Sequence, residues 1–243
     1  MEIEVLSDCA TVAERAATII AQTAHLAVAA RQRFVFAVSG GNTPWLMLSK
    51  LGGKDLPWQK THILQVDERV APAGDPDRNL TRLQANLLAH TLLRPEQLHA
   101  MPVEKSDLRA AAAEYAAVLR DLAGFPPILD LVHLGLGTDG HTASLLPGDS
   151  VLEVNDQDVS ISGPRENRVR MTLTYPTLNR ARSILWLVTG ADKAAILRRL
   201  RDGDPSIPAG RVRRTNARIL TDYAAAGFVA TGGGDAAPGA DLA

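Results

Sequence analysis

The sequence is poor in cysteine and in aromatic residues. Cys9 is the single cysteine among 243 residues, so an intrachain disulfide and a cysteine-based zinc site are excluded. A chain without disulfides suits a reducing compartment, and we predict a cytoplasmic location. Cys9 precedes an alanine-rich segment and is expected to be a small packing residue. Aromatic residues make up 4% of the chain, so aliphatic side chains and alanine must fill the core.

The chain also lacks an excess of charge of either sign and any long apolar run. Its 26 basic and 27 acidic residues give a net charge of -1, which argues against nucleic acid as a partner. No apolar run approaches the roughly 20 residues of a membrane span, and the N-terminus does not resemble a signal peptide. The arginines between Arg198 and Arg218 are interrupted by Asp202 and Asp204, which favours a solvated surface.

Strand-like and helix-like segments alternate along the chain. Several of the strand-like segments are continuously apolar, a pattern typical of a mostly parallel sheet that is covered on both faces. The predicted strands include residues 34–38, 61–66, 128–134 and 183–188, and the predicted helices include residues 9–31, 80–90, 108–124 and 191–203. No repeat or linker divides the chain. We predict one domain over residues 1–230 and a disordered tail, rich in glycine, over residues 231–243.

Four polar or glycine-rich loops follow predicted strands. They read "SGGNTP" (39–44), "DERVAP" (67–72), "GLGTDGH" (135–141) and "TGADK" (189–193). In open parallel sheets, ligands bind beyond the carboxyl ends of the strands. The four loops together therefore predict one binding site at that edge.

The first and last of these loops favour an anion. Gly40 and Gly41 permit close approach of the backbone, and the helix start that follows offers free N–H groups. Lys193 stands in a first helical turn, where the helix dipole disfavours a cation unless an anionic ligand is present. Arg182 precedes the same strand and reaches either that anion or solvent. No Walker pattern is present, so a nucleoside triphosphate is not implied.

The letters "GLGTDG" match the dinucleotide fingerprint, but their context does not. The carboxylate of Asp139 would repel a pyrophosphate, and Pro147 ends the following segment too early for a crossover helix. His141 directly after the loop suits a general base, and Asp139 is placed to orient it. No second histidine stands at a metal-ligand spacing, and His133 lies on an apolar strand, as a core histidine does.

The "DER" segment allows two interpretations. Asp67 and Arg69 are either a solvated ion pair or polar contacts to sugar hydroxyls, and their spacing does not decide between the two.

Five blocks together resemble one family. "SGGNTP", "DERVAP", "LGLGTDGHTASLLPG", "RMTLTYPTLNRARSILWLVTGADKA" and "IPAGRV" occur in the order found in the 6-phosphogluconolactonases, and the similarity runs over roughly residues 3–227. The chain resembles the bacterial single-domain form. The resemblance implies a three-layer α/β/α sandwich with a modified Rossmann-like sheet. It also implies hydrolysis of 6-phosphoglucono-1,5-lactone in the pentose phosphate pathway, with no cofactor. We expect a monomer or weak homo-oligomer whose partner is this phosphorylated sugar lactone.

The resemblance also assigns roles to residues. His141 would be the base that activates water, with Asp139 in support. Asp67 and Arg69 would contact the ring or the phosphate. Asn79 matches the family, whereas Arg78 stands where the family usually has serine. The phosphate would be held by the glycine turn and two basic residues: Ser39, Gly40, Gly41, Asn42, Thr43, Arg182 and Lys193.

Two alternatives stay open at this point. A glucosamine-6-phosphate deaminase shares the fold and the phosphate loop, but the glutamate of its motif falls at Leu146 here. A leucine cannot relay a proton. A sugar-phosphate sensor that binds DNA would need a helix-turn-helix, for which no segment is left over.

Overall fold

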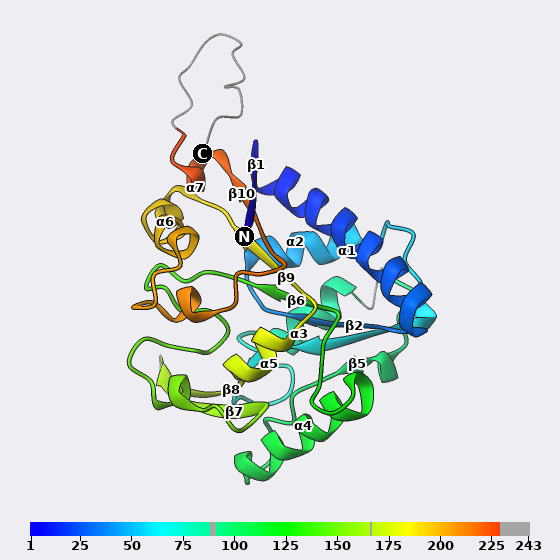
Figure 1. Cartoon of the computed structure of the whole chain (residues 1–243). Coiled ribbons are helices and arrows are strands. Elements are labelled where there is room, and N and C mark those ends of the chain that lie inside the picture. Colours follow the sequence, from blue (N-terminus) through cyan, green and yellow to red (C-terminus); the bar gives the residue numbers. More distant parts are fainter. Residues whose placement is uncertain (88–90, 166, 229–243) are drawn as a thin grey trace.

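Seven parallel strands form the main sheet of the computed structural model, which describes residues 1–87, 91–165 and 167–228 (Figure 1). Across the sheet, the order is β1 (Glu2–Leu6), β10 (Ala217–Asp222), β9 (Ser183–Val188), β6 (Leu131–Leu134), β2 (Phe34–Val38), β3 (Thr61–Gln65) and β5 (Leu98–His99). Every pairing in this sheet is parallel, which confirms the prediction from the apolar runs.

A second, antiparallel sheet was not expected from the sequence. Its order is β4 (Asp67–Arg69), β8 (Arg168–Leu173) and β7 (Val159–Arg165). The prediction of a polar loop over residues 67–72 is therefore wrong at its start, because Asp67 to Arg69 pair with Arg170 to Thr172 of β8. The strand β7 contains a glycine and a proline, so its sequence lacks the alternating pattern by which a strand is predicted.

The helices follow the predicted segments closely, except that none was predicted over Tyr175–Arg180 or Tyr223–Ala226. They are α1 (Cys9–Arg31), α2 (Asn42–Leu51), α3 (Asn79–Leu87), α4 (Leu108–Ala123), α5 (Tyr175–Arg180), α6 (Ala194–Asp202) and α7 (Tyr223–Ala226). Short 3-10 turns are η1 (Trp58–Lys60), η3 (Pro95–Gln97), η4 (Ser150–Glu153), η5 (Ala191–Lys193) and η6 (Pro208–Arg211). The helix α1 starts where the Asp8 side chain accepts a hydrogen bond from the backbone N–H of Thr11, which is typical of an N-cap.

Alternate side chains of each central strand enter two different cores. In β2, Phe34 and Phe36 pack on the side of α1 and α2, whereas Val35 and Ala37 pack with residues of α4, α5 and α6. Successive side chains of a strand point to opposite faces, so both faces of the sheet are covered by helices. This confirms the three-layer α/β/α arrangement, and Figure 1 shows α1 and α4 on different sides of the strands.

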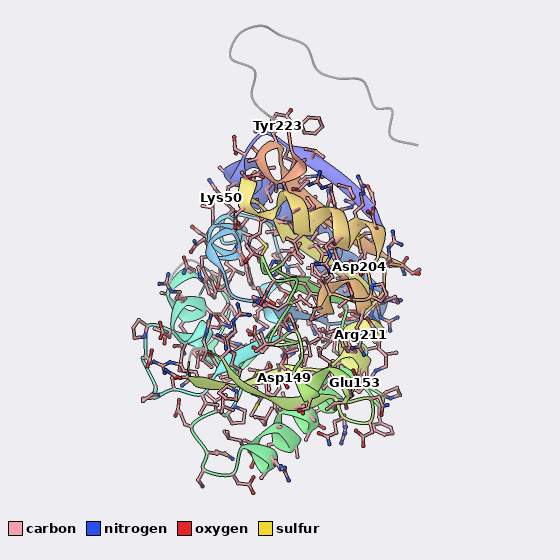
Figure 2. The ribbon with its side chains drawn as sticks, turned by 90° about the vertical axis from the view of Figure 1, so that its left-hand side faces the viewer. Lys50, Asp149, Glu153, Asp204, Arg211 and Tyr223 are labelled. Carbon is pink, nitrogen blue, oxygen red and sulfur yellow. The ribbon has the colours of Figure 1, made fainter. Side chains whose placement is uncertain are left out.

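Arginines of the segment between Arg198 and Arg218 form contacts with other residues of the same chain. Arg211 forms an ion pair of 3.1 Å with Glu153 and lies over the ring of Tyr175, and Figure 2 shows Arg211 and Glu153 close together. Arg218 pairs with Glu2 at 2.7 Å. These contacts agree with the expected salt-bridged surface.

Two predictions touch residues outside the described ranges. The predicted tail over residues 231–243 lies beyond them, as do the last three residues of the predicted helix 80–90. In residues 1–87, 91–165 and 167–228, no helix has both the length and the apolar character needed to cross a membrane.

Candidate active site

A cavity of about 480 Å³ opens at the carboxyl ends of β2, β6 and β9. The strand β2 lies between β3, which follows it in the sequence, and β6, so the strand order reverses at this point. Ligand sites of open α/β sheets occur at such switch points. All four loops predicted from the sequence reach the cavity, which is lined by Ser39 to Pro44, Asp67, Arg69, Asn79, Gly135 to Gly137, His141, Ala143, Arg170, Leu187 to Thr189, Asp192 and Lys193.

The glycine turn after β2 forms one wall of the cavity. The backbone N–H of Ser39 donates to Nδ1 of the buried His133 at 3.3 Å. A Cβ atom on Gly40 would lie 2.1 Å from Oδ1 of Asn79, so only glycine fits there. The helix α2 begins at Asn42 without a side-chain cap. The N–H groups of its first turn are therefore available to an anion.

His141 also lines the cavity and is held by Asp139. Its Nδ1 atom is 2.5 Å from Oδ1 of Asp139, and the second oxygen of that carboxylate accepts a bond of 2.8 Å from Arg165. Arg165 Nη1 is also 3.0 Å from Nδ1 of His141. A Cβ atom on Gly137 would lie 2.0 Å from Nδ1 of His141, so this glycine leaves room for the ring.

Burial and charge set the protonation of this pair. Burial lowers the pKa of His141, and the hydrogen bond and charge of Asp139 raise it without reversing the net decrease. Burial also raises the pKa of Asp139, but the hydrogen bonds from His141 and the charges of His141 and Arg165 lower it to about 2. At neutral pH the carboxylate is therefore charged, and the imidazole is mostly neutral.

The "DER" segment and α3 form the floor of the cavity. Asp67 is buried and accepts a bond of 2.7 Å from the Ser144 hydroxyl, which ties β4 to the loop after His141. Arg69 donates to Oδ1 of Asn79 at 2.7 Å. Asp67 and Arg69 therefore do not pair with each other as a solvated ion pair, and both line the cavity.

Glu68, between these two residues, was not singled out from the sequence. It is fully buried and accepts bonds of 2.8 Å from the backbone N–H groups of Asn79 and Leu80. Its carboxylate thus caps the start of α3 and fixes the position of Asn79. Arg78 is also buried, beside Glu68 and Glu104, so its role at this position is structural.

Lys193 reaches the cavity from the end of β9. It lies in the short turn η5 and pairs with Asp192 at 3.4 Å, with 23% of its side chain exposed. The hydroxyls of Thr43 and Thr189 are 2.7 Å apart and join this loop to the glycine turn. The two loops predicted to hold an anion therefore lie side by side.

The prediction that Arg182 helps to hold the phosphate needs correction. It precedes β9, whereas Lys193 follows it, and the two ends of a strand lie at opposite edges of the sheet. Its backbone N–H donates to the Leu129 carbonyl, and its side chain faces Asp130 at 3.5 Å. Arg182 does not line the cavity, so we no longer assign it to the phosphate.

The structure brings the other predicted residues together and adds two arginines. Asp139 stands behind His141, and the remaining predicted residues line the cavity. Arg170 lines the cavity from β8 and is buried, and Arg165 contacts the Asp139–His141 pair. The only sequence signal for Arg170 was the alternating segment "RVRMTLT" (168–174), and Arg165 lies outside it. Among the described residues, no group of three or more metal-ligating side chains could hold a metal ion.

Comparisons with known proteins identify the family of the chain. The family model described as "Glucosamine-6-phosphate isomerases/6-phosphogluconolactonase" matches residues 7–221. A 6-phosphogluconolactonase of Synechocystis is 36% identical over 196 residues, which cover 79% of this chain and 81% of that protein.

Similarity to solved structures shows the fold but does not separate the two activities of the family. The 6-phosphogluconolactonase of Thermotoga maritima is 23% identical, with a TM-score of 0.81 over 91% of this chain and 98% of that one. A monomeric glucosamine-6-phosphate deaminase is 20% identical, with the same TM-score of 0.81 over 94% of this chain and 100% of that one. The side chains of the site must therefore distinguish a lactonase from a deaminase.

Proposed function

The chain belongs to the family of glucosamine-6-phosphate isomerases and 6-phosphogluconolactonases, and we propose that it hydrolyses 6-phospho-D-glucono-1,5-lactone to 6-phospho-D-gluconate with His141 as the general base. The enzyme is a 6-phosphogluconolactonase, a carboxylic ester hydrolase of the pentose phosphate pathway. The observation that carries the mechanism is the contact between Nδ1 of His141 and the Asp139 carboxylate, 2.5 Å long.

This contact defines which nitrogen of His141 can act as a base. A charged carboxylate only accepts hydrogen bonds, and Asp139 at 2.5 Å is closer to Nδ1 than Arg165 Nη1 is at 3.0 Å, so we place the proton of the neutral imidazole on Nδ1. The lone pair then lies on Nε2. Because Arg165 holds the other oxygen of Asp139 at 2.8 Å, the carboxylate keeps its orientation toward the ring. The arrangement matches the general pattern of a base that is oriented by a third group.

Hydrolysis then proceeds in two steps. Nε2 of His141 takes a proton from water while the water oxygen attacks the carbonyl carbon, and a tetrahedral intermediate forms. The bond between that carbon and the ring oxygen then breaks, and the ring oxygen receives the proton from Nε2. The product is an open-chain acid, which ionises to the carboxylate. Help from a general base is typically worth about 10²- to 10⁴-fold in rate.

The phosphate is positioned by the other wall of the cavity. Lys193 and the N–H groups at the start of α2 provide positive charge and hydrogen-bond donors at one end. Asp67 and Arg69, fixed by Ser144 and Asn79, contact the ring. Anchoring the phosphate places the lactone carbonyl near His141 and contributes positioning energy.

Position 146 favours the lactonase over the deaminase. The deaminase motif carries a glutamate there that works with the histidine in ring opening, whereas this chain has a leucine that is 7% exposed. A buried leucine transfers no proton, and hydrolysis of a lactone needs only one base. The Synechocystis relative, which carries the lactonase name, supports the same choice.

The test uses purified protein and freshly generated lactone, with release of 6-phosphogluconate followed by a coupled dehydrogenase. The wild type should exceed the spontaneous rate, and His141→Gln should lower kcat by about 10²- to 10⁴-fold. His25→Gln, at an exposed histidine, serves as the matched control. A wild-type rate equal to the spontaneous one rejects the function. Full activity of His141→Gln rejects the mechanism alone.

A further inference from the structure

A second cavity, of about 280 Å³, adjoins the first and is lined mainly by arginine. The two cavities share Gly41, Asn42, Arg69, Asn79 and Arg170. Five arginines line the second cavity, Arg69, Arg82, Arg165, Arg168 and Arg170, whereas Asp77 is its one acidic lining residue in the described part of the chain.

Four of these arginines stand in directly opposed pairs on the small sheet. Arg69 of β4 faces Arg170 of β8, and Arg165 of β7 faces Arg168 of β8. Arg168 and Arg170 are two residues apart, so they point to the same face of β8. Like charges directly opposite each other destabilise a sheet. An anion bound between them would offset that repulsion.

Acidic residues contact two of these arginines. Arg168 pairs with Asp75 and Asp77, both at 3.2 Å, and Arg165 pairs with Asp139. Arg69, by contrast, donates to the neutral amide of Asn79.

Arg82 adds a charge from the first turn of α3. Its side chain is exposed, and within the described ranges no acidic residue pairs with it. Arg82 therefore brings to the second cavity a positive charge that no acidic residue of the described ranges pairs with. Trp45 of α2 forms part of its wall.

We propose that this second cavity binds the phosphate group of a small molecule, in addition to the substrate phosphate in the first cavity. Planar guanidinium groups from four elements, α3, β4, β7 and β8, line this cavity, and arginine binds phosphate through paired hydrogen bonds. The proposal rests on the proposed function in one respect only, namely that the substrate occupies the first cavity.

The first cavity leaves the second available to another ligand. Its volume of about 480 Å³ lies within the range of small-molecule sites, roughly 300–1,000 Å³, so one phosphorylated lactone fits there without the second cavity. Lys193 lines the first cavity alone, and Arg82 lines the second alone. Each cavity therefore has a basic residue by which it can be tested separately.

The experiment is calorimetric titration of the full chain with inorganic phosphate, which requires no turnover. The wild type should bind two phosphates. Arg82→Gln should weaken one of the two sites by about three- to tenfold and leave lactone hydrolysis unchanged, whereas Lys193→Gln should weaken the other. Arg198→Gln, at an exposed arginine of α6, is the matched control and should bind as the wild type does.

A second arm identifies the source of the phosphate. With the first cavity saturated by 6-phosphogluconate, inorganic phosphate should still bind the wild type and bind Arg82→Gln more weakly. If the product itself fills the second cavity, titration with 6-phosphogluconate should instead show two sites in the wild type, one of them weakened by Arg82→Gln. A single phosphate site that responds to Lys193→Gln and not to Arg82→Gln overturns the proposal, even if the lactonase activity is measured as expected.

Discussion

Replacing Asp139 by asparagine tests whether the carboxylate sets the protonation of the general base His141. Asparagine keeps the size of the side chain but removes the charge that holds the proton on Nδ1 of His141, 2.5 Å away. The amide can present its oxygen or its NH₂ group to the ring. In the second case Nδ1 becomes the acceptor, the proton moves to Nε2, and the nitrogen that faces water can no longer act as a base.

Two changes should follow, one in the rate and one in the pKa of His141. Loss of the correct tautomer removes much of the benefit of the general base, so we expect kcat at neutral pH to fall by about 10²-fold or more. The hydrogen bond and charge of Asp139 raise the pKa of His141 against the lowering effect of burial. Removing them lowers that pKa further.

The sign of the pH effect follows from the role of His141. A base works in its deprotonated form, so kcat/KM falls as the pH drops through the pKa of the free enzyme. In Asp139→Asn the plateau should be lower, and the acid limb should lie at lower pH than in the wild type.

The assay is the lactonase rate between pH 5 and pH 7.5, corrected for spontaneous hydrolysis, with near-UV circular dichroism as the control for folding. An acid limb that moves to higher pH, or a variant with the wild-type rate, would refute this account of the pair.

Three further variants test other parts of the structure. Gly137→Ala should reduce kcat by at least tenfold in a folded protein, because its Cβ would lie 2.0 Å from Nδ1 of His141; an unchanged rate would mean that the ring can move without loss. Lys193→Gln should raise KM for the lactone by about tenfold with little change in kcat. Arg182→Gln, away from the cavity, should leave KM unchanged. An equal rise in KM for both variants would mean that Arg182 contacts the phosphate after all. Burial lowers the pKa of His133 to about 3, so from pH 6.5 downward the unfolded chain binds a proton that the folded chain does not. The free energy of unfolding should therefore decrease as the pH decreases. His133→Asn should reduce the slope of this free energy against pH by about 1.4 kcal/mol per pH unit in urea titrations at pH 5 and pH 6. An unchanged slope would contradict the burial of this residue.

The main sheet was predictable because its signals are local. Each central strand, such as Phe34–Val38, is a short apolar run followed by a glycine or polar turn. Parallel strands place their carboxyl ends at one edge, so the glycine turn, His141 and Lys193 could be grouped without knowledge of the strand order.

The small sheet could not be predicted in the same way. The strand β4 has three residues, and its partner β8 lies about 100 positions later in the sequence. No periodicity identifies a strand so short, and its pairing depends on the rest of the fold. The arginines that this sheet brings to the two cavities, Arg165 and Arg170 among them, were therefore not assigned from the sequence.

Arg182 shows where grouping by sequence proximity fails. It lies only 11 positions from Lys193, but β9, which separates them, has six residues. At about 3.3 Å per residue, such a strand is about 20 Å long. A basic residue before a strand and one after it therefore cannot hold the same phosphate. The same reasoning applies to every loop of this sheet: residues that follow a strand share the site, and residues that precede it belong to the opposite edge.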